Sequence, residues 1–345
     1  MTANPSNDPA MNIKKVAALA GVSTATVSRT INGSPLVSPA TAEKVWHTIH
    51  RLGYFPNTQA RALVSGHSRI LGLIISDITN PFFPELVKSF EQAAIAGGYE
   101  VIVANTDYES SRMSLCVRRM IERQVDGVAI MTSELEHHLL EQLALRQSPI
   151  VFLDHEQLPL VNRVCDISVD YAGGIRMAVE HLLALGHLRM GFISGPQDLS
   201  SARTRRHAFL ECLAEHGLTG RESYIVEGDH KVEGGYRAMH SLLQLSERPT
   251  AVLASNDLTA LGALRALADE GVSVPEEMSL IGFDDIQISG YMQPPLTTIR
   301  LSREELGRKA FELLASALRE EFPVGRRLYQ GTNLVVRGTT AAPRH

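Results

Sequence analysis

The spacing of hydrophobic and polar positions changes once along the chain, near residue 70. From residue 12 to residue 53, apolar residues recur every three or four positions in short runs that end at glycine, which predicts short helices. From residue 70 onward, short β-rich apolar runs alternate with amphipathic stretches. This alternation predicts parallel sheets with helices on both faces. We therefore expect a small all-α domain followed by a larger α/β domain.

Two helices separated by a tight turn are expected at the start of the first region. Asn12 is a candidate N-cap for a helix over 13–20, and Gly21 is suited to end it. Ser23 is the candidate N-cap of a second helix over 24–31. Helices joined by so short a turn are typical of the helix-turn-helix motif.

The second of these helices has an unusual composition. Thr, Ser and Arg dominate between Thr24 and Ile31, which is a poor choice for a helix that serves stability alone. The same residue types contact phosphates and base edges when a helix lies in a major groove. The composition of the second helix therefore predicts that this region binds DNA.

A third helix is expected from Ser38 to Gly53, with its apolar face buried.

The charge of the chain is divided unevenly between the two regions. The chain as a whole has a net charge of −5, which by itself argues against a nucleic-acid partner. Between residues 12 and 69, seven basic residues stand against one acidic residue, a net charge of +6 that leaves −11 for the rest. A basic head on an acidic body predicts an anionic partner for the head alone.

Strand-like runs and helical stretches follow one another through the acidic body. The strand-like runs include Leu71–Ile75, Glu100–Ala104, Gly127–Met131, Ile150–Leu153, Met190–Ile193, Ala251–Ala254 and Leu280–Phe283. The helical stretches include Phe83–Ala96, Arg112–Arg123, Tyr171–Leu185 and Leu258–Glu270. The runs that begin at Leu71 and Met190 have the character of first strands in two similar units. This predicts two lobes with a cleft between them.

Polar side chains follow several of these strand-like runs. They are Asn80, Asp154, Asn256, Asp257, Asp284 and Asp285. Ligands of open parallel sheets bind at the carboxyl ends of the strands, so these side chains are candidates for a binding site. Carboxylate, amide and guanidinium groups suit a polyhydroxylated ligand, and Phe82 and Phe83 add an aromatic face. For Asp257 and Asp285, helix capping is an equally good interpretation.

The residues of the basic head resemble those of a known family. The run from Val16 to Arg29, VAALAGVSTATVSR, is similar to the DNA-reading head of the lactose/galactose repressor (LacI/GalR) family. The similarity continues through Asn32-Gly33, Val37-Ser38 and the run from Leu52 to Asn57, and it covers nearly the whole chain. Within the family, the positions that contact ligands are most similar to those of ribose and purine repressors.

The resemblance implies how the chain is divided. It implies a disordered tail at 1–11, a helix-turn-helix DNA-binding domain at 12–57 and a hinge helix or linker at 58–68. The remainder, 69–340, is expected to be a two-lobed effector-binding and dimerisation domain similar to periplasmic sugar-binding proteins. The N-lobe is expected at about 69–167 plus 299–329, and the C-lobe at about 168–298 plus 330–340.

The resemblance also implies which residues bind DNA. Thr24, Ala25 and Arg29 match the positions where the family reads bases, and Arg29 suits a bidentate contact with guanine. The residues expected to position the DNA backbone are Ser23, Thr26, Ser28 and Asn32. In the hinge, Leu63 matches a side chain that wedges into the minor groove and kinks the duplex, with Ala60 and Arg61 beside it.

For the effector, the resemblance implies a larger set. It consists of Asn80, Phe82, Phe83, Asp154, His155, Arg205, His230, Asn256 and Asp284. His155 and His230 stand where relatives often place Arg or an aromatic residue, and Leu301 replaces a frequent polar contact. These departures argue against ribose itself and leave a purine or nucleoside open.

These expectations describe a transcriptional regulator, a repressor, that binds operator DNA as a homodimer and is controlled by a small molecule, a sugar foremost. The helices at Phe83–Ala96 and Arg112–Arg123 are candidates for the dimer interface. The competing hypotheses are a sugar-handling enzyme and a sugar-transport protein. The sequence has no P-loop, nucleophile elbow, zinc-ligand spacing or dinucleotide fingerprint, so neither catalysis nor a cofactor or metal is expected.

The location of the protein is expected to be cytoplasmic. The longest apolar run, Ile70–Ile75, is far shorter than the ~18 residues of a membrane span. The first eleven residues are polar and lack the apolar core of a signal peptide. Cys116, Cys165 and Cys212 are widely separated, which indicates free thiols and no disulfide framework.

Overall fold

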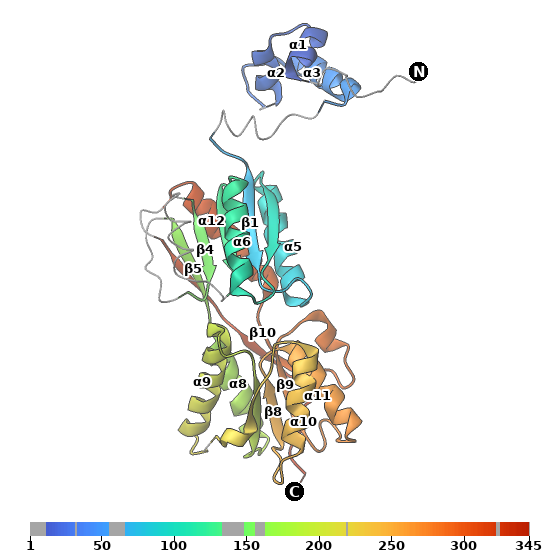
Figure 1. Cartoon of the computed structure of the whole chain (residues 1–345), viewed down its shortest axis with the longest axis vertical. Helices are drawn as coiled ribbons and strands as arrows, with labels where there is room; N and C mark the ends of the chain where they lie inside the picture. The colour runs from blue at the N-terminus through green and yellow to red at the C-terminus, as the bar shows by residue number, and fades with distance from the viewer. Residues whose placement is uncertain are drawn as a thin grey trace. The chain divides into compact units, whose positions relative to one another are not determined.

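The protein is described by a computed structural model, and it folds as two units, residues 1–68 and 69–345. Figure 1 labels the helices of both units and several of the strands. The structure describes residues 12–31, 33–54, 66–132, 148–155, 163–218, 220–321 and 325–344. The predicted tail at 1–11, Asn32 and the hinge residues Ala60, Arg61 and Leu63 lie outside the described residues.

The first unit is a bundle of three helices with the predicted bounds. They are α1 (Ile13–Ala20), α2 (Thr24–Ile31) and α3 (Pro39–Leu52). Their apolar faces meet in one small core that consists of Val16, Ala17, Ala20, Val27, Val45 and Ile49. Burial of this core holds together helices that are each too short to be stable alone in water.

The ends of these helices are set by local chemistry. The side chain of Asn12 accepts a hydrogen bond from the backbone N–H of Lys15 at 3.1 Å, and Ser23 Oγ accepts one from the backbone N–H of Thr26 at 3.1 Å. Gly21 and Gly53 end α1 and α3 in the left-handed conformation, at φ values of 65° and 59°. Glycine adopts that conformation without a steric penalty, which explains why both helices stop at the predicted residues.

The second unit contains two sheets, each with six described strands. The first sheet has the order β11-β5-β4-β3-β1-β2, and the second has the order β12-β10-β9-β8-β6-β7. The strands of the first are β1 (Ile70–Ile75), β2 (Glu100–Asn105), β3 (Gly127–Met131), β4 (Ile150–Leu153), β5 (Val164–Val169) and β11 (Arg327–Gln330). Those of the second are β6 (Met190–Ser194), β7 (Ile225–Glu227), β8 (Ala251–Ala254), β9 (Ser279–Asp284), β10 (Thr297–Arg300) and β12 (Asn333–Val335). All described pairs are parallel except β10 with β12, which confirms the predicted parallel sheets.

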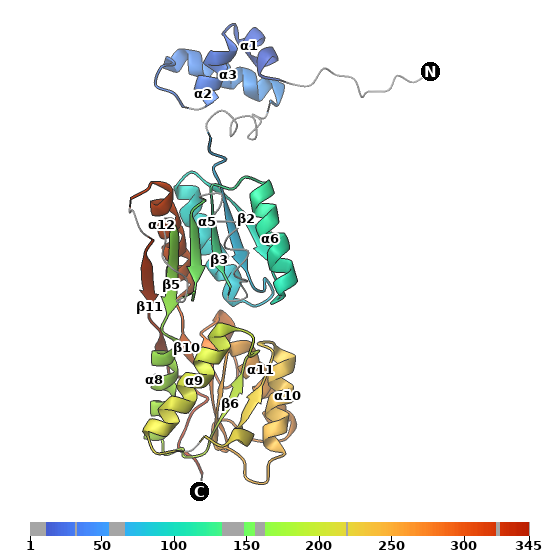
Figure 2. The same cartoon turned by 60° about the vertical axis from the view of Figure 1, so that its left-hand side comes forward.

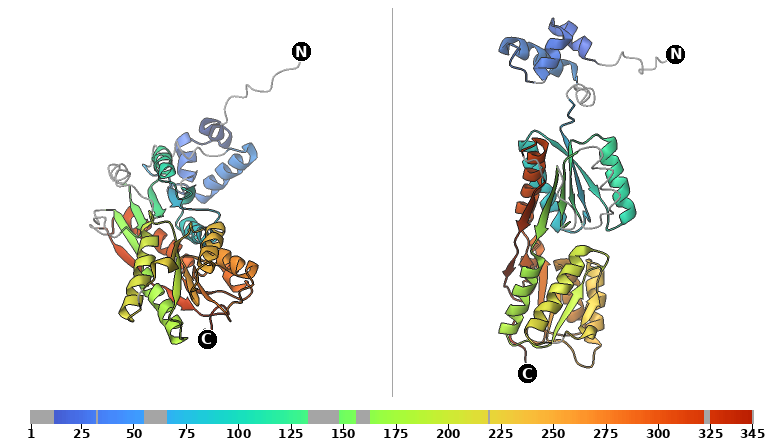
Figure 3. Two further views of the ribbon diagram at one scale, coloured as in Figure 1. Left: turned by 60° about the horizontal axis from the view of Figure 1, so that its bottom comes forward. Right: turned by 90° about the vertical axis from the view of Figure 1, so that its left-hand side faces the viewer.

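In the first lobe, α5 and α12 cover one face of the sheet and α6 covers the other (Figure 3, right). These helices span Phe82–Ala96 (α5), Ser110–Glu122 (α6) and Arg303–Leu318 (α12). Successive residues of a strand point to opposite faces. Leu71 and Leu73 of β1 therefore join the apolar cluster of α5 and α12, whereas Ile74 joins the cluster of α6.

The second lobe repeats this arrangement. Its helices are α8 (Tyr171–Ala184), α9 (Ser200–Glu215), α10 (Val232–Leu243) and α11 (Asp257–Asp269), with short 3-10 turns at Glu222–Tyr224 and Gln287–Gly290. Figure 2 shows α8 and α9 on one side of the sheet and α10 and α11 on the other. Phe192 of β6 stacks on Phe209 of α9 with ring centroids 5.0 Å apart, and the next residue, Ile193, belongs to the opposite cluster with Met239.

The chain passes between the two lobes three times. The first passage follows β5, which ends at Val169, the second follows β10, which ends at Arg300, and the third joins β11 to β12 after Gln330. These three strand ends, Val169, Arg300 and Gln330, lie one or two residues after the lobe boundaries that were expected from the sequence. Because three separate segments connect the lobes, the cleft between them is bordered by residues that are far apart in the chain.

Candidate functional site

One cavity lies at the carboxyl ends of strands from both lobes. Ser76, Thr132 and Asp154 follow β1, β3 and β4 of the first lobe, while Asn256 and Asp284 lie at the ends of β8 and β9 of the second. The cavity is partly open, and about 70 Å³ of it is accessible to water-sized molecules. It therefore brings side chains of both lobes together around one space that solvent can reach.

Eight of the nine residues expected at the effector site line this cavity. They are Asn80, Phe82, Phe83, Asp154, Arg205, His230, Asn256 and Asp284. The ninth, His155, does not belong to the lining. Asp154 has a positive φ of 60°, which turns the chain at the strand end. The His155 ring packs edge-on against Phe152 at 5.2 Å, and its backbone N–H donates to Asp166 at 2.9 Å.

Arg205 of α9 belongs to the part of the cavity lining that the second lobe contributes. Its guanidinium lies 4.5 Å from the ring centre of Tyr171 and 4.3 Å from that of Phe283. Nη1 donates to the backbone oxygen of Ser255 at 2.8 Å, whereas the buried Nε has no hydrogen-bond partner among the described residues. Two aromatic faces therefore hold the guanidinium by cation–π contact, and the N–H of Nε stays unpaired.

Asp154 is already fully engaged by the protein. One carboxylate oxygen accepts the backbone N–H of Val169 at 2.8 Å, and the other accepts the hydroxyl of Tyr171. Burial raises the pKa of Asp154 to about 7, and the hydrogen bond from Tyr171 opposes this shift. Since Asp154 follows a strand of the first lobe and Tyr171 begins a helix of the second, this pair ties the two lobes together at the base of the cavity.

Asn256 likewise makes its hydrogen bonds within the protein. Its side-chain oxygen caps α11 by accepting the backbone N–H of Thr259 at 2.8 Å. Its side-chain nitrogen donates to the backbone oxygen of His230 at 3.0 Å. Asn256 therefore positions His230. The side-chain oxygen of Asn80 also accepts a backbone N–H close by in the sequence, that of Phe82, at 3.0 Å.

His230 is held in a strained position against the cavity. Its φ is 61°, its side chain is buried, and Nε2 has no partner among the described residues. A Cβ added at Gly195 would lie 1.9 Å from that Nε2, so only glycine leaves room for the ring. Burial lowers the pKa of His230 to about 3, and the positive charge of Arg205 adds to this effect. The imidazole is therefore neutral at neutral pH.

The acidic residues after β8 and β9 have different roles. Burial raises the pKa of Asp284 to about 7, opposed by Arg205 and Arg303, and no described residue donates a hydrogen bond to its carboxylate. Asp257 lies outside the lining, where its carboxylate accepts bonds from the loop after β9. Asp285 pairs with Arg300 and Arg337, each at 2.6 Å. Asp257 does not cap α11, because the side chain of Asn256 does so. Asp285 does not cap the 3-10 turn that follows it, because that turn has no side-chain cap.

Several residues of the lining were not among those predicted. They are Ser76, Tyr108, Met131, Thr132, Leu153, Tyr171, Leu199 and Ser201. Leu301, which was expected to replace a polar contact, also lies in the lining. Tyr108 and Tyr171 follow the ends of β2 and β5 within three residues. The rule that singled out the Asp and Asn side chains at strand ends therefore also identifies these two tyrosines, once aromatic residues are included.

The first unit presents a separate polar surface on α2. Thr24, Ala25 and Arg29 are exposed, whereas Val27 and Thr30 are buried in the core of the unit. Ser23 is exposed as well, and Thr26 and Ser28 are half-buried. The guanidinium of Arg29 makes no hydrogen bond or ion pair with any described residue, although its backbone oxygen accepts the N–H of Ser34 at 2.9 Å. The side of α2 that faces away from the core is therefore free to meet an external surface.

Among the described residues, none of the helices is long and apolar enough to cross a membrane. The described part of the chain also holds no group of three His, Cys, Asp or Glu side chains arranged for a metal ion. All three cysteines are buried as free thiols.

In comparisons with known proteins, each of the two units matches the model of a known family. Residues 12–57 match the model of bacterial regulatory proteins of the lacI family, and residues 179–340 match the model of a periplasmic binding protein-like domain. The chain is 34% identical to the HTH-type transcriptional repressor PurR of Aliivibrio salmonicida, over 90% of this chain and 92% of that protein.

Solved structures show the same likeness in three dimensions. The lac repressor dimer bound to operator and the anti-inducer ONPF matches with a TM-score of 0.86 and 30% identity, over 96% of this chain and 99% of that one. A LacI family regulator from Enterococcus faecium with bound ribose matches with a TM-score of 0.70 and 28% identity, over 80% of this chain and all of that one. The protein therefore belongs to the lacI family, and it is a DNA-binding transcriptional repressor and not an enzyme.

Proposed function

We propose that this repressor senses a small polyhydroxylated effector, a sugar, in the cavity between its lobes. The observation that carries the proposal is a set of polar groups in the cavity lining that have no hydrogen-bond partner among the described residues. Arg205 Nε and His230 Nε2 are buried without such a partner, and the carboxylate of Asp284, a residue that is 6% exposed, accepts no hydrogen bond from any described residue. Leaving such groups unpaired costs free energy, and the hydroxyl groups of a sugar satisfy both donors and acceptors.

The proposed effector contacts both lobes at once. Asn80, Phe82 and Phe83 lie on the first lobe, and Arg205 and Asp284 lie on the second. A ligand that bridges two bodies stabilises the arrangement in which both contacts are made. In a dimer, such a change alters the spacing of the two hinge segments and so changes operator affinity.

The protein is proposed to act as a homodimer on operator DNA in the cytoplasm. The lac repressor, to which the chain is similar, was solved as a dimer on operator, and two-fold symmetric dimers bind two half-sites. The exposed apolar side chains of the first lobe include Ile78, Ile95, Val103 and Leu115. Exposed apolar side chains that lie together mark interaction surfaces, and Ile95 and Leu115 lie on the two helices that are candidates for the interface.

A purine or nucleoside is the second candidate effector. Phe82, Phe83, Tyr108 and Tyr171 line the cavity together with the neutral imidazole of His230, and the rings of Tyr108 and His230 are 6.2 Å apart. Aromatic rings stack on flat heterocycles as readily as on the apolar face of a sugar. A thermal-shift screen of pentoses, hexoses, purines and nucleosides separates the two candidates, because only the true effector raises the melting temperature.

Arg29 provides the test of the DNA-binding surface. Arg29→Ala should lower the preference for operator over random DNA by about 1–3 kcal/mol, because a bidentate arginine–guanine contact is worth that much. Fluorescence anisotropy with operator DNA and with random DNA measures the ratio of the two affinities. Arg51→Ala removes an equal charge from the exposed surface of α3 and should weaken both affinities alike. An unchanged operator preference in Arg29→Ala would contradict the base-reading role.

A further inference from the structure

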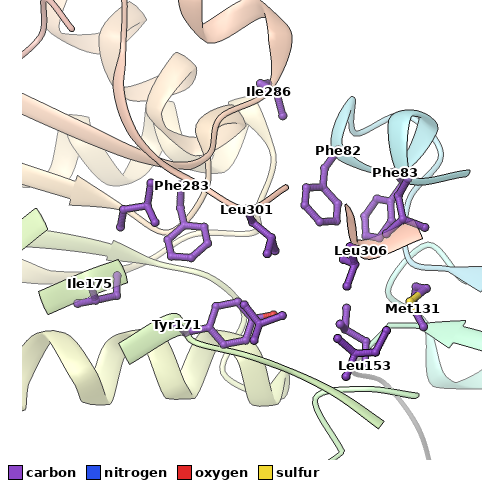
Figure 4. Packing of buried hydrophobic residues seen from close by; sticks show 14 of the residues in the cluster. Phe82, Phe83, Met131, Leu153, Tyr171, Ile175, Phe283, Ile286, Leu301 and Leu306 are labelled. Carbon is purple, nitrogen blue, oxygen red and sulfur yellow. The ribbon is translucent and has the colours of Figure 1, made fainter. Parts of the chain in front are cut away.

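A second hollow lies in the second lobe, at the opposite edge of the sheet from the cavity. It is lined by residues at the start of β6, near the end of α9 and beside the 3-10 turn at Glu222–Tyr224. The cavity lies at the carboxyl ends of the strands, where Figure 4 shows Tyr171 and Phe283 of the second lobe opposite Phe82. The five residues of β6, about 16 Å of extended chain, run from one to the other. This hollow is defined here as the distal pocket, and it is a different site from the cavity.

Much of the lining of the distal pocket is apolar. About 440 Å³ of this partly open space is accessible to water-sized molecules, a size typical of sites that hold small molecules. The apolar side chains of the lining are Leu188, Met190, Leu213 and Leu218. Met190 and Leu213 are buried, whereas Leu188 is 68% exposed. An apolar molecule that covered Leu188 would remove both surfaces from water, which is favourable.

Two arginines of the lining share one carboxylate. Arg221 Nη1 donates to Glu247, and its guanidinium lies 5.4 Å from the ring centre of Tyr224. Arg189 Nη1 lies 3.8 Å from Glu247 Oε1, and Arg189 Nε donates to the backbone oxygen of Arg248 at 3.2 Å. Nη2 of Arg189 and both Nε and Nη2 of Arg221 donate no hydrogen bond to any described residue. Each guanidinium therefore keeps N–H donors for a further acceptor.

The charges at the distal pocket favour an anion. Two arginines stand against one glutamate, which leaves one positive charge on a body whose net charge is −11. Guanidinium groups bind carboxylates through paired hydrogen bonds. One spare positive charge matches the single negative charge of a carboxylate more closely than the nearly two charges of a phosphate monoester.

From the apolar lining and the two arginines we infer that the distal pocket binds a small amphipathic carboxylate, such as a medium-chain fatty acid or an arylalkanoic acid. The carboxylate group binds Arg189 and Arg221, and the apolar chain packs on Leu188 and Leu218. The distal pocket is then a second ligand site of this repressor. It does not depend on which molecule binds in the cavity between the lobes.

Four probes test the inference on the full-length protein. They are octanoate, 1-octanol, acetate and octyl phosphate, each titrated by calorimetry below the concentration at which it forms micelles. Octanoate should bind at one site per chain and at least about tenfold more tightly than 1-octanol or acetate, which corresponds to about 1.4 kcal/mol. The reason is that 1-octanol lacks the charge and acetate lacks the chain. Octyl phosphate should bind no more tightly than octanoate.

Surface variants assign the binding to the distal pocket. Arg189→Gln and Arg221→Gln each remove one charge and should weaken octanoate binding at least about fivefold without changing the affinity for 1-octanol. Glu247→Gln removes the competing carboxylate and should strengthen octanoate binding at least about twofold, an effect that loss of a purely structural ion pair would not produce. The control is Arg237→Gln on α10, an exposed arginine paired with Asp229 at 3.0 Å and absent from the pocket lining, which should leave octanoate binding unchanged.

Each part of the inference can be overturned separately. Octanoate that binds no more tightly than 1-octanol, or that binds Arg189→Gln and Arg221→Gln as well as the unaltered protein, overturns the role of the arginines. Acetate that binds as tightly as octanoate overturns the role of the apolar lining. Tighter binding of octyl phosphate overturns the carboxylate as the head group. Absence of octanoate binding, or an equal loss in Arg237→Gln, overturns the distal pocket as a ligand site and leaves the proposed sugar sensor untouched.

Discussion

At the scale of single residues, the polar side chains around the cavity fall into two groups. Asp154 and Asn256 use their side-chain oxygens on backbone and tyrosine donors, so they shape the site. Arg205 and His230 each keep a buried nitrogen without a partner among the described residues, so they are available to a ligand. Buried polar atoms are normally paired, and the exceptions therefore indicate where an external partner binds.

Tyr171 is expected to be a positioning residue of the cavity. Tyr171→Phe keeps the ring against Arg205 but removes the hydroxyl that donates to Asp154. The buried carboxylate then lacks one donor, and the free energy of unfolding should fall by about 1–3 kcal/mol. Urea denaturation measures the change. The control is Tyr291→Phe, where the side chain is 80% exposed and a change below about 0.5 kcal/mol is expected. Equal effects in the two variants would argue against the tie between the lobes.

Asp284 should make stability depend on pH. Burial raises its pKa to about 7 in the folded protein, against about 3.9 in an unfolded chain. Its contribution to stability is therefore fully present below about pH 4 and is lost as the pH rises through about 7. Asp284→Asn cannot ionise, so its unfolding free energy relative to the unaltered protein should increase between about pH 4 and pH 7. Asp198→Asn, at an exposed carboxylate, should show a flat difference, and a flat difference for Asp284→Asn would refute the assignment.

At the scale of elements, the packing of α10 on α11 determines where His230 stands. A Cβ at Gly235 of α10 would lie 2.1 Å from the backbone oxygen of Thr259, and one at Gly262 of α11 would lie 1.9 Å from that of Val232. Glycine at both positions lets the two helix backbones approach closely. Because Asn256 at the start of α11 bonds the backbone of His230 just before α10, this close approach sets the position of the imidazole.

Gly262→Ala tests this arrangement. The added methyl group forces the helices apart, which should cost about 1–3 kcal/mol of unfolding free energy and weaken effector binding by displacing His230. Chemical denaturation and calorimetry measure the two effects. The control is Gly290→Ala, because an added Cβ there meets nothing within 4 Å. Effector binding that is unchanged in a destabilised Gly262→Ala would separate helix packing from the site.

At the scale of the whole molecule, the residues that line the cavity come from many segments of the chain, from Ser76 to Leu301. The three passages of the chain between lobes, the Asp154–Tyr171 bond and the ion pair of Asp107 with Lys231 at 3.9 Å all join the two bodies. The proposed effector adds further bridges at the same interface. On that proposal, the free energy of effector binding is available to change the lobe arrangement and, through the predicted hinge, the affinity for operator.

Arg205→Ala should uncouple the two activities. Without the guanidinium, the effector identified by screening should no longer change operator affinity, because its contact with the second lobe is lost. Anisotropy of labelled operator with and without effector measures the coupling. Arg203→Ala, on the same helix but exposed and outside the cavity lining, should retain the response. Loss of the response in both variants would point to general damage to α9.

Local signals predicted much of the fold. The helices of the head have the predicted bounds because caps and terminal glycines act within one turn. The seven strand-like runs that were named in the body match described strands to within one residue at each end, since buried parallel strands need continuous apolar runs. The strands β5, β7, β10, β11 and β12 were not among the named runs. Eight of the nine predicted effector residues line the cavity for a related reason, namely that strand ends gather at one edge.

The sequence by itself determined the order of elements, the basic head and the acidic body, because these depend on neighbouring residues and on composition. The tertiary structure alone decided which polar groups are free. Asp154 is occupied by a tyrosine 17 positions away, Arg205 bonds the backbone at Ser255, 50 positions away, and His230 fits only because Gly195 makes room. Hydrogen-bond satisfaction and close packing depend on atoms that folding brings together, and no local pattern encodes them.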